Sequence, residues 1–349
     1  MKCWMRLLRI ELTSKIDPHL KMVFGSTQTQ TKRKYEHGIP SPTINDCLTI
    51  KVDGTKYPAT AKDKGTLTIC NLTYETIIKI KLMQYYMIKI YCGYQSMGNE
   101  GFPIFEGEIA YMSPKIYSNH DVEVYIIYTS SLVARYSQNR MNFSLNSGTN
   151  LYAAMNYMLA SQGVRNKNID PRLKDAFINE YKTLYGKANT ILDSATLNNV
   201  GDYSISTDGV DGNVIDITTL KGKRTILVNE KFLPIGSGNP IVTSEGLSMT
   251  LLPVRNFKVG DILKINNALI NTSISSAENV SSTFNTNYLD ASSNGSLVNV
   301  DGSYNKEASY GYYMIVEMHY TLENRGNTFQ YQIKGRALSI IKNLAGVSE

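Results

Sequence analysis

The chain has 349 residues, of which 42% are hydrophobic and 10% aromatic, so a disordered polymer is excluded and two or three domains are expected. Tyrosine supplies most of the aromatic surface, with 24 Tyr against 9 Phe and 1 Trp, and this suits half-covered sheet faces and subunit interfaces. The net charge of +6 is spread along the chain. Nucleic-acid binders show a denser basic stripe, so specific nucleic-acid binding is not expected.

The N-terminal stretch MKCWMRLLRIELTSK is interrupted by Arg6 and Arg9, which leaves no apolar core for a signal peptide. No apolar run approaches membrane-spanning length either, so we expect neither secretion nor membrane insertion. The four cysteines are Cys3, Cys47, Cys70 and Cys92. They form no CxxC pair, which favours reduced thiols, with one Cys47–Cys70 or Cys70–Cys92 bridge as the alternative.

Residues 48–129 read as a succession of strands. The alternating or β-branched and aromatic runs are 48–54, 65–72, 76–83, 86–94, 102–113 and 121–129. The first run, LTIKVDG, ends in Asp-Gly, which is typical of a hairpin turn. Several strands this close together, with no helical pattern between them, predict an antiparallel barrel or sandwich.

The hydrophobic period then changes to that of a helix. In SGTNLYAAMNYMLASQGV, apolar residues recur at i, i+3, i+4, i+7 and i+8 from Leu151, and Thr149 or Asn150 can cap the start. A second helix is predicted in IDPRLKDAFINEYKTLYGKA, with Asp170 as its cap and Gly186 after its last turn. Both apolar stripes are interpreted as core-facing.

Strand patterns return after about residue 203. The runs are 212–222, 223–236, 245–252 and 259–266. The Ser/Asn/Thr-rich stretch 271–309 predicts a surface insertion. The closing segment 314–338 predicts a hairpin with Glu323–Asn327 as its turn, because two alternating runs flank a short polar stretch.

These patterns predict an α+β fold in which β structure predominates. The boundaries are an N-terminal segment (1–44), a first β domain (45–146), a helical plus small β middle domain (147–240) and a second β domain (241–349) that carries the insertion 271–309.

Candidates for chemistry are few. The four histidines, His19, His37, His120 and His319, have no His or Cys within five residues, so no local zinc pair is present in the sequence. No GxSxG elbow, Walker loop or dinucleotide fingerprint occurs. Two carboxylate pairs have the residue types of a glycosidase, Glu106 with Glu108 in a strand and Asp208 with Asp211 in a turn. Both pairs also have sufficient structural explanations, so we expect no enzyme, no cofactor and no metal.

Six stretches in a fixed order carry a family resemblance. They are GTLTICNLTYET (65–76), FPIFEGEIAYMSPKI (102–116), DVEVYIIYTSSLV (121–133), GTNLYAAMNYMLASQGV (148–164), EGLSMTLLPVRNFKVGDILKIN (245–266) and YYMIVEMHYTLENRGNTFQYQIKGRAL (312–338). Together they resemble the baseplate hub proteins of contractile phage tails, whose fold is shared by the hub part of type VI secretion spike proteins. The match covers most of the chain after residue 45. It departs at Leu252–Pro253, where the family pattern has Asn-Pro, and at 271–309, which has no counterpart.

The resemblance implies two tail-tube-like antiparallel β-barrel or sandwich domains with a small helical and β insertion between them. It further implies a homotrimer of pseudo-six-fold symmetry that joins the hexameric tail tube to the trimeric central spike. The implied partners are the tail tube protein, a separate central spike protein, baseplate wedge proteins and the tape measure protein, with DNA passing through without specific binding. The implied location is the virion tail baseplate, after assembly in the host bacterial cytoplasm.

Subunit-interface residues are predicted from strand edges and aromatic faces. They are Tyr86, Ile88, Ile90, Tyr125, Ile127, Tyr313, Ile315, Phe329, Tyr331 and Ile333. Two alternatives remain open: a tail-associated cell-wall glycan hydrolase or glycan-binding module that uses one of the carboxylate pairs, and a tail tube or tube-initiator protein. Tube subunits are usually shorter, with one such β domain, so the chain length favours the hub.

Overall fold

The computed structural model of the chain describes residues 6–14, 16–17, 19–25, 35–36, 39–40, 48–57, 63–82, 85–94, 101–116, 122–130, 140–161, 167–187, 191, 203–208, 211–216, 223–234, 240–243, 246–265 and 312–337. The chain forms two compact units. The first comprises Met1–Ile215, Pro253–Asn256 and Tyr320–Phe329, and the second comprises Asp216–Leu252, Phe257–His319 and Gln330–Glu349. Antiparallel strands predominate, which confirms the predicted fold class.

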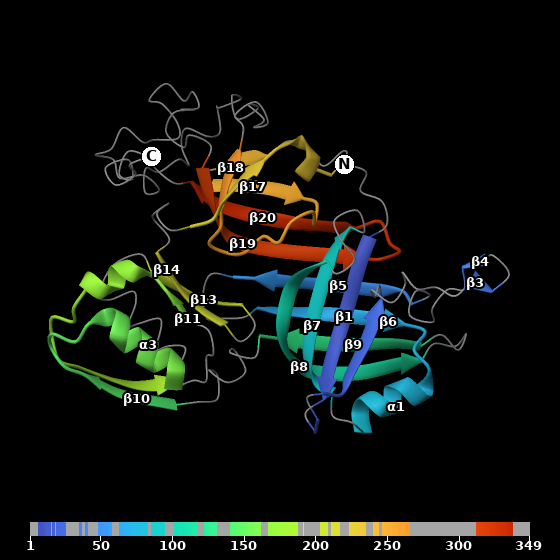
Figure 1. The fold of residues 1–349 in the computed structure, drawn as a ribbon, viewed down its shortest axis with the longest axis horizontal. Coiled ribbons are helices and arrows are strands. Elements are labelled where there is room, and N and C mark those ends of the chain that lie inside the picture. Colours follow the sequence, from blue (N-terminus) through green and yellow to red (C-terminus); the bar gives the residue numbers. More distant parts are fainter. Residues whose placement is uncertain are drawn as a thin grey trace. The chain divides into compact units, whose positions relative to one another are not determined.

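The first unit contains a curved antiparallel sheet with the order β5-β6-β9-β8-β7-β1-β2 (Figure 1). The strands are β1 (Arg6–Ser14), β2 (Lys21–Gly25), β5 (Ile50–Lys56), β6 (Lys64–Cys70), β7 (Tyr85–Tyr94), β8 (Phe102–Ile116) and β9 (Val122–Thr129). Strand β8 pairs with β7 through its first half and with β9 through its second half. A Cβ added to Gly25 in β2 would lie 3.2 Å from Cδ1 of Ile50 in β5, so the two ends of the sheet meet across the core. The sheet therefore curls around its core in the manner of a barrel.

The core of this sheet follows from period-2 alternation. In β5, Ile50 and Val52 are buried, whereas Lys51 and Asp53 are exposed. Alternation also buries one face of β1, β6, β7 and β9. The apolar residues of this core with no measurable exposure are Leu8, Ile10, Leu12, Ile50, Leu67, Ile69, Ile88, Ile90, Cys92, Val124, Ile126 and Tyr128.

The N-terminal stretch differs from the prediction of a separate segment over 1–44. Strand β1 lies between β7 and β2 in the same sheet, with Ile10 opposite Ile90. Its apolar residues alternate with Arg9 and Glu11, so one face enters the core and the other carries the charges. A further short pair, β3 (Tyr35–Glu36) with β4 (Ile39–Pro40), also precedes residue 45.

The strand predicted at 76–83 is wrong, because Tyr74–Leu82 forms helix α1. Thr73 starts the helix: its hydroxyl accepts from the Thr76 N–H at 3.3 Å, and its carbonyl accepts from the Ile77 N–H at 3.1 Å. The buried residues Ile77 and Ile80 are three apart and share the inner face of the helix. The run TIIKIKLM satisfies both periods, and the cap decides in favour of the helix.

The middle region of the first unit contains the predicted helix α3, at Leu151–Ser161. Its remaining elements are β10 (Arg140–Leu145), β11 (Lys167–Ile169), 3-10 helix η4 (Pro171–Asp175), β12 (Lys182–Lys187), β13 (Tyr203–Asp208) and β14 (Asp211–Asp216). Strand β10 pairs with β12, and β14 lies between β11 and β13. The inner residues of β10 pack with α3 around a separate core that includes Met141, Leu145, Met155, Met158 and Leu159.

The second helix predicted over residues 170–186 is wrong beyond its first turn. After η4 the backbone pairs with the segment that precedes α3. The Gly148 N–H donates to the Ile178 carbonyl at 2.8 Å, and the Ile178 N–H donates to the Thr149 carbonyl at 2.9 Å. These long-range bonds use the backbone groups that a continuing helix would need, so the chain extends into β12.

The second unit contains strands in the order β16-β17-β20-β19-β18-β15. They are β15 (Thr225–Val228), β16 (Ile241–Thr243), β17 (Gly246–Leu251), β18 (Ile262–Ile265), β19 (Tyr312–Glu323) and β20 (Phe329–Ala337), with 3-10 helix η5 (Glu230–Phe232) after β15. The hairpin predicted at 314–338 is confirmed as β19–β20. The predicted insertion 271–309 lies outside the described residues. In the part of the chain that is described, no helix has the length and hydrophobicity needed to cross a membrane.

Candidate assembly surfaces

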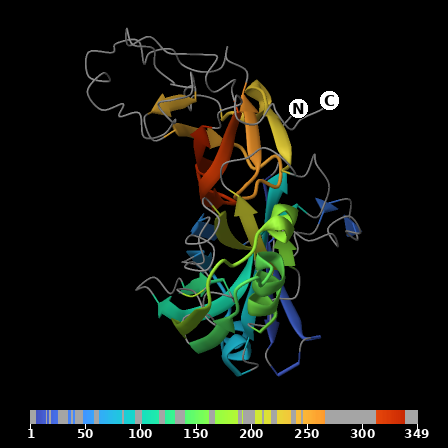
Figure 2. The same ribbon diagram turned by 90° about the vertical axis from the view of Figure 1, so that its left-hand side faces the viewer.

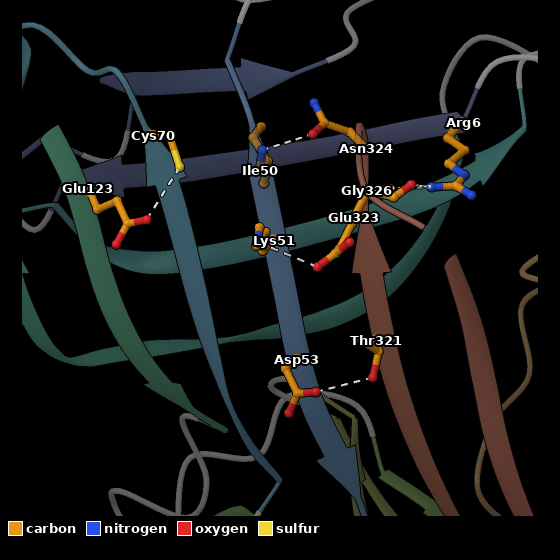
Figure 3. Close-up of polar contacts among 10 residues, drawn as sticks. All are labelled: Arg6, Ile50, Lys51, Asp53, Cys70, Glu123, Thr321, Glu323, Asn324 and Gly326. Carbon is orange, nitrogen blue, oxygen red and sulfur yellow. Dashed lines mark hydrogen bonds and ion pairs between the residues drawn. The ribbon is translucent and has the colours of Figure 1, made fainter. Parts of the chain in front are cut away.

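The tip of hairpin β19–β20, residues Tyr320–Phe329, belongs to the first unit and holds its strands together (Figure 3). The Asn324 side chain accepts from the Ile50 N–H at 2.8 Å and donates to the Leu48 carbonyl at 2.9 Å. Three residues before Asn324, on β19, the Thr321 hydroxyl donates to the Asp53 carboxylate at 3.1 Å. Residues near the end of the chain thus complete the edge of a sheet that begins near residue 6.

Arg6, the first residue of β1, closes the turn of this hairpin. Its guanidinium donates to the carbonyls of Glu323 at 3.0 Å, Gly326 and Asn327, and it lies 5.4 Å from the centre of the Phe329 ring. A planar group with five donors suits several carbonyls at once, which Lys cannot match. Arg6 therefore links the two ends of the chain within the first unit.

Replacing Arg6 by Ala is expected to lower the free energy of unfolding by about 1–3 kcal/mol, because three turn carbonyls lose a charged donor. Arg6→Lys should recover only part of the loss. Urea denaturation followed by circular dichroism gives the values. The control is Lys51→Ala, whose ion pair with Glu323 spans 3.7 Å and is half exposed, so a change below about 1 kcal/mol is expected. Equal effects of the two substitutions would contradict the role of Arg6.

Two buried tyrosines anchor the hairpin tip in the barrel core. The hydroxyl oxygens of Tyr128 and Tyr320 lie 3.1 Å apart, and Tyr128 Oη donates to the Asp53 carbonyl at 3.2 Å. Burial raises the pKa of both tyrosines well above the ordinary value, so both stay neutral. Room for the hydroxyls comes from Gly54 and Gly65, which face each other across β5 and β6.

The two carboxylate pairs singled out from the sequence fall on three strands, β8, β13 and β14. Glu106 and Glu108 lie on the outer face of β8, and a Glu106 oxygen is 2.8 Å from Nζ of its cross-strand neighbour Lys89. Desolvation lowers the pKa of Lys89, but the hydrogen bond and charge of Glu106, together with the charges of Tyr91 and Glu11, outweigh it, and the net pKa is raised. Asp208 ends β13 and Asp211 begins β14, and their side chains lie outside the described part of the structure. Glu106 thus serves as the partner of a surface ion pair.

The two described cysteines form no disulfide, and the described side chains form no metal-binding cluster. Cys70 and Cys92 are not disulfide-bonded, and the Cys70 thiol lies 4.0 Å from a Glu123 oxygen (Figure 3). Both bridges that the sequence left open involve Cys70, so neither is formed. Among the residues with described side chains, no three His, Cys, Asp or Glu side chains gather at one point.

Seven of the ten predicted interface residues are buried within the single chain. They are Ile88, Ile90, Tyr313, Ile315, Phe329, Tyr331 and Ile333, none more than 3% exposed. Such side chains have no exposed area left to contribute to a subunit interface. The remaining three, Tyr86, Tyr125 and Ile127, keep exposed surface.

An outer aromatic patch combines Tyr125 and Ile127 of β9 with Tyr111 of β8. Tyr111 is the cross-strand neighbour of Ile127, and it is 53% exposed. Tyr111 was missed from the sequence because the register shift between Ile109 and Tyr111 moves it to the outer face. Exposed aromatic rings on a sheet face are typical of interaction surfaces.

A second apolar surface lies at one end of the first β domain. Helix α1 and the turn between β1 and β2 lie next to one another there, as both views show (Figures 1 and 2). The turn exposes Ile16 (61%) and Leu20 (40%), and α1 exposes Tyr74 (72%) and Leu82 (69%). Four large apolar side chains on two adjacent elements form what we call the end surface. Sequence patterns did not reveal it, because two of its members lie in a turn and two in a segment interpreted as a strand.

Comparisons with known proteins identify the fold. No family model and no curated protein matches the sequence. A tail protein from Neisseria meningitidis MC58 is similar in structure, with a TM-score of 0.50 and 7% identity over 95% of this chain and 97% of that one. The 43 kDa tail protein of prophage MuSo2 from Shewanella oneidensis gives a TM-score of 0.49 and 5% identity, over 82% of this chain and 95% of the other.

A third similar structure is an Escherichia coli component of the type VI secretion system, described as structurally similar to tail proteins of bacteriophage T4. Its TM-score is 0.48 at 10% identity, over 86% of this chain and 76% of that one. At these identities the likeness concerns the fold. The chain has a fold like that of a tail protein, and the resemblance predicted from the sequence is confirmed at the level of the fold.

Proposed function

We propose that the chain is the structural baseplate hub of a contractile phage tail, a homotrimer that joins the hexameric tail tube to the trimeric central spike. The observation that carries the proposal is the likeness of fold to a tail protein over nearly the full length of both chains. The two β-rich compact units support two tube-like domains in each chain, so a trimer presents six such domains and matches a six-fold tube.

The exposed surfaces supply contacts of the kind this role requires. The end surface on α1 and the β1–β2 turn lies at one end of the first β domain and suits the next ring, formed by the tail tube protein. The patch of Tyr111, Tyr125 and Ile127 lies on a sheet face and suits a lateral neighbour. Further partners are the spike, baseplate wedge and tape measure proteins, and DNA passes without specific binding. The protein acts in the virion tail after assembly in the host cytoplasm.

Neither alternative function gains support from a specific observation. A retaining or inverting glycosidase needs two carboxyl groups that flank a substrate, whereas Glu106 is engaged by Lys89 on a convex sheet face. A tube or tube-initiator protein would assemble with six chains in each ring, so the number of chains separates it from the hub. We therefore propose a structural role without catalysis.

Light scattering of the purified protein, alone and with the candidate spike chain, tests the proposal. The expected result is a mass of three times the 39.0 kDa chain for the protein alone, or that mass plus the mass of the bound spike when the spike is needed for trimerisation. A chain that stays monomeric with the spike and in the assembled particle would overturn it.

Placing a charge on the end surface is expected to block stacking on the tail tube. In Leu82→Glu, a carboxylate on a surface that must be desolvated should weaken binding of the trimer to the tube protein by about tenfold or more. Co-sedimentation with assembled tubes measures the affinity. Leu227→Glu is the matched control, since Leu227 is 57% exposed on β15 of the second unit. Undiminished binding by the Leu82 variant would exclude this surface from the contact.

A further inference from the structure

The two-stranded ribbon β10–β12 has two very different faces. Its inner side chains, Met141, Leu145 and Leu184, pack into the core formed with α3. Its outer side chains point the other way, because successive residues of a strand alternate. The exposed residues of this outer face are Arg140, Asn142 and Ser144 on β10, and Thr183, Tyr185 and Lys187 on β12. Tyr181, just before β12, adds a ring that is 62% exposed.

The two tyrosines of this face are held by their hydroxyls. Nη1 of Arg140 donates to the Tyr185 hydroxyl at 3.3 Å. Hydrogen bonds from Ser144, and secondarily from Thr183, lower the pKa of Tyr181. A hydrogen bond at the phenol oxygen limits the positions that the ring can take, and Tyr185 still exposes 68% of its surface. Pre-positioned rings lose little conformational entropy when a partner covers them.

The charge of the ribbon favours an acidic partner. Arg140 and Lys187 are cross-strand neighbours at one end of the face. Within residues 140–145 and 180–187, the basic side chains are Arg140, Lys182 and Lys187, and the only acidic one is Glu180. The face itself therefore presents positive charge, tyrosine rings and small hydrogen-bonding groups. Protein interfaces are enriched in Tyr and Arg, and antibody binding loops add Ser and Asn, whereas nucleic-acid surfaces carry denser basic stripes.

We propose that the outer face of the β10–β12 ribbon docks an acidic surface of a neighbouring protein in the tail. Two tyrosine rings provide the contact area, and Arg140 with Lys187 pairs with carboxylates of the partner. An isologous contact with a second copy of the same face is disfavoured, because like charges would meet. The inference rests on the proposed function only in placing the chain within a tail.

Tyrosine footprinting tests the docking on the unmodified protein. Tetranitromethane nitrates exposed tyrosines, and mass spectrometry compares the free chain with purified tails. Nitration of Tyr181 and Tyr185 should fall at least about tenfold in the tail, because interface cores exclude water. Tyr157, 66% exposed on α3 of the same region, is the internal reference for reagent access. A chain present in tails with both tyrosines still reactive overturns this inference alone, whereas a chain absent from tails overturns the proposed function.

The acidic character of the partner has its own test. A zero-length carbodiimide joins Lys187 to a carboxylate only where the two are in contact, and peptide mass spectrometry identifies the joined residue. We expect a link from Lys187 to an Asp or Glu of another tail protein. Links to this chain alone, or protection of the tyrosines by glycan without a protein link, would overturn the proposal.

Charge reversal completes the experiment. Arg140→Glu with Lys187→Glu should reduce incorporation into tails by about tenfold or more, because carboxylates would then face carboxylates. The control pair, Lys231→Glu with Arg255→Glu, makes the same change of charge at exposed positions elsewhere. Circular dichroism of the free variants verifies folding. Equal incorporation of both double variants would contradict the proposal.

Discussion

Gly65→Ala is expected to lower the free energy of unfolding by about 2–4 kcal/mol, through overpacking and the loss of a buried hydrogen bond. A Cβ at this position would overlap both the Tyr128 hydroxyl and the Asp53 carbonyl oxygen. The carbonyl belongs to the backbone of β5 and cannot move alone, so Tyr128 must leave its hydrogen bond. Its displaced hydroxyl would remain in a core where Tyr128 and Tyr320 have no measurable exposure.

A double-mutant cycle separates this mechanism from a general intolerance of β6 to substitution. Tyr128→Phe removes the hydroxyl that collides with the added methyl group, so it should be less harmful in the Gly65→Ala background than in the unmodified chain. Thr66→Ala is the control, since Thr66 is the next residue of the strand and lies on its other face. Urea denaturation gives all four free energies. Strict additivity would show that the hydroxyl and the methyl group do not compete for the same space.

Asp261→Ala is expected to destabilise the second unit by about 2–3 kcal/mol, since a buried acceptor serves several donors at once. Asp261 is 7% exposed. Its carboxylate accepts from Arg224, with Nε at 3.1 Å, and from the Lys258 N–H at 2.7 Å. The expected loss of stability is smaller than for a fully buried ion pair, because the Arg224 side chain is 48% exposed and regains water when its partner is lost.

Two further variants identify which bond of Asp261 matters. Asp261→Asn keeps an acceptor for the Lys258 N–H but loses the charge, so it should cost about half as much as Asp261→Ala. Thr225→Ala, next to Arg224 and exposed on β15, should be close to neutral. Chemical denaturation followed by circular dichroism measures each loss. If Asp261→Ala left the free energy of unfolding unchanged, the Asp261 carboxylate would not be what anchors β18.

The Gly-Asp pair at 260–261 also explains part of the family resemblance in physical terms. Gly260 has a φ of +92°, a region that favours glycine, and its N–H donates to the Ile315 carbonyl at 2.9 Å. The Asp261 carbonyl accepts from the Ile315 N–H at 2.8 Å. The motif therefore fixes the entry of β18 onto β19. From the sequence it was visible only as a pattern, because its partners lie more than 50 residues away.

Elements whose apolar residues fit the period of only a helix or only a strand were predictable. Elements whose apolar residues fit both periods were not. Helix α3 and hairpin β19–β20 show a single clear period and turn chemistry, and both are confirmed. Helix α1 was misread because Ile77, Ile78 and Ile80 fit a strand as well as a helix. The helix predicted after Asp170 ends early because backbone groups around Thr149 and Ile178 bind each other. No local pattern contains that information.

The assembly surfaces were less predictable than the fold. Alternation separates the two faces of a strand, but it does not say which face the same chain covers. Ile88 and Tyr331 were therefore predicted as interface residues, although the core of the curved sheet buries Ile88 and the core of the second unit buries Tyr331. Tyr125 is exposed and Ile127 is partly exposed, and both stay a proposal as interface residues. The end surface depends on a helix and a turn that meet only in the folded chain.

Electron cryomicroscopy of the purified oligomer, with the spike chain added if needed, tests the central claim most directly. The account predicts three chains around an axial channel, with six β domains arranged in a pseudo-six-fold ring. A ring of six chains would identify a tube or tube-initiator protein instead. A monomer with no ring, in both the free protein and the tail, would contradict the hub altogether.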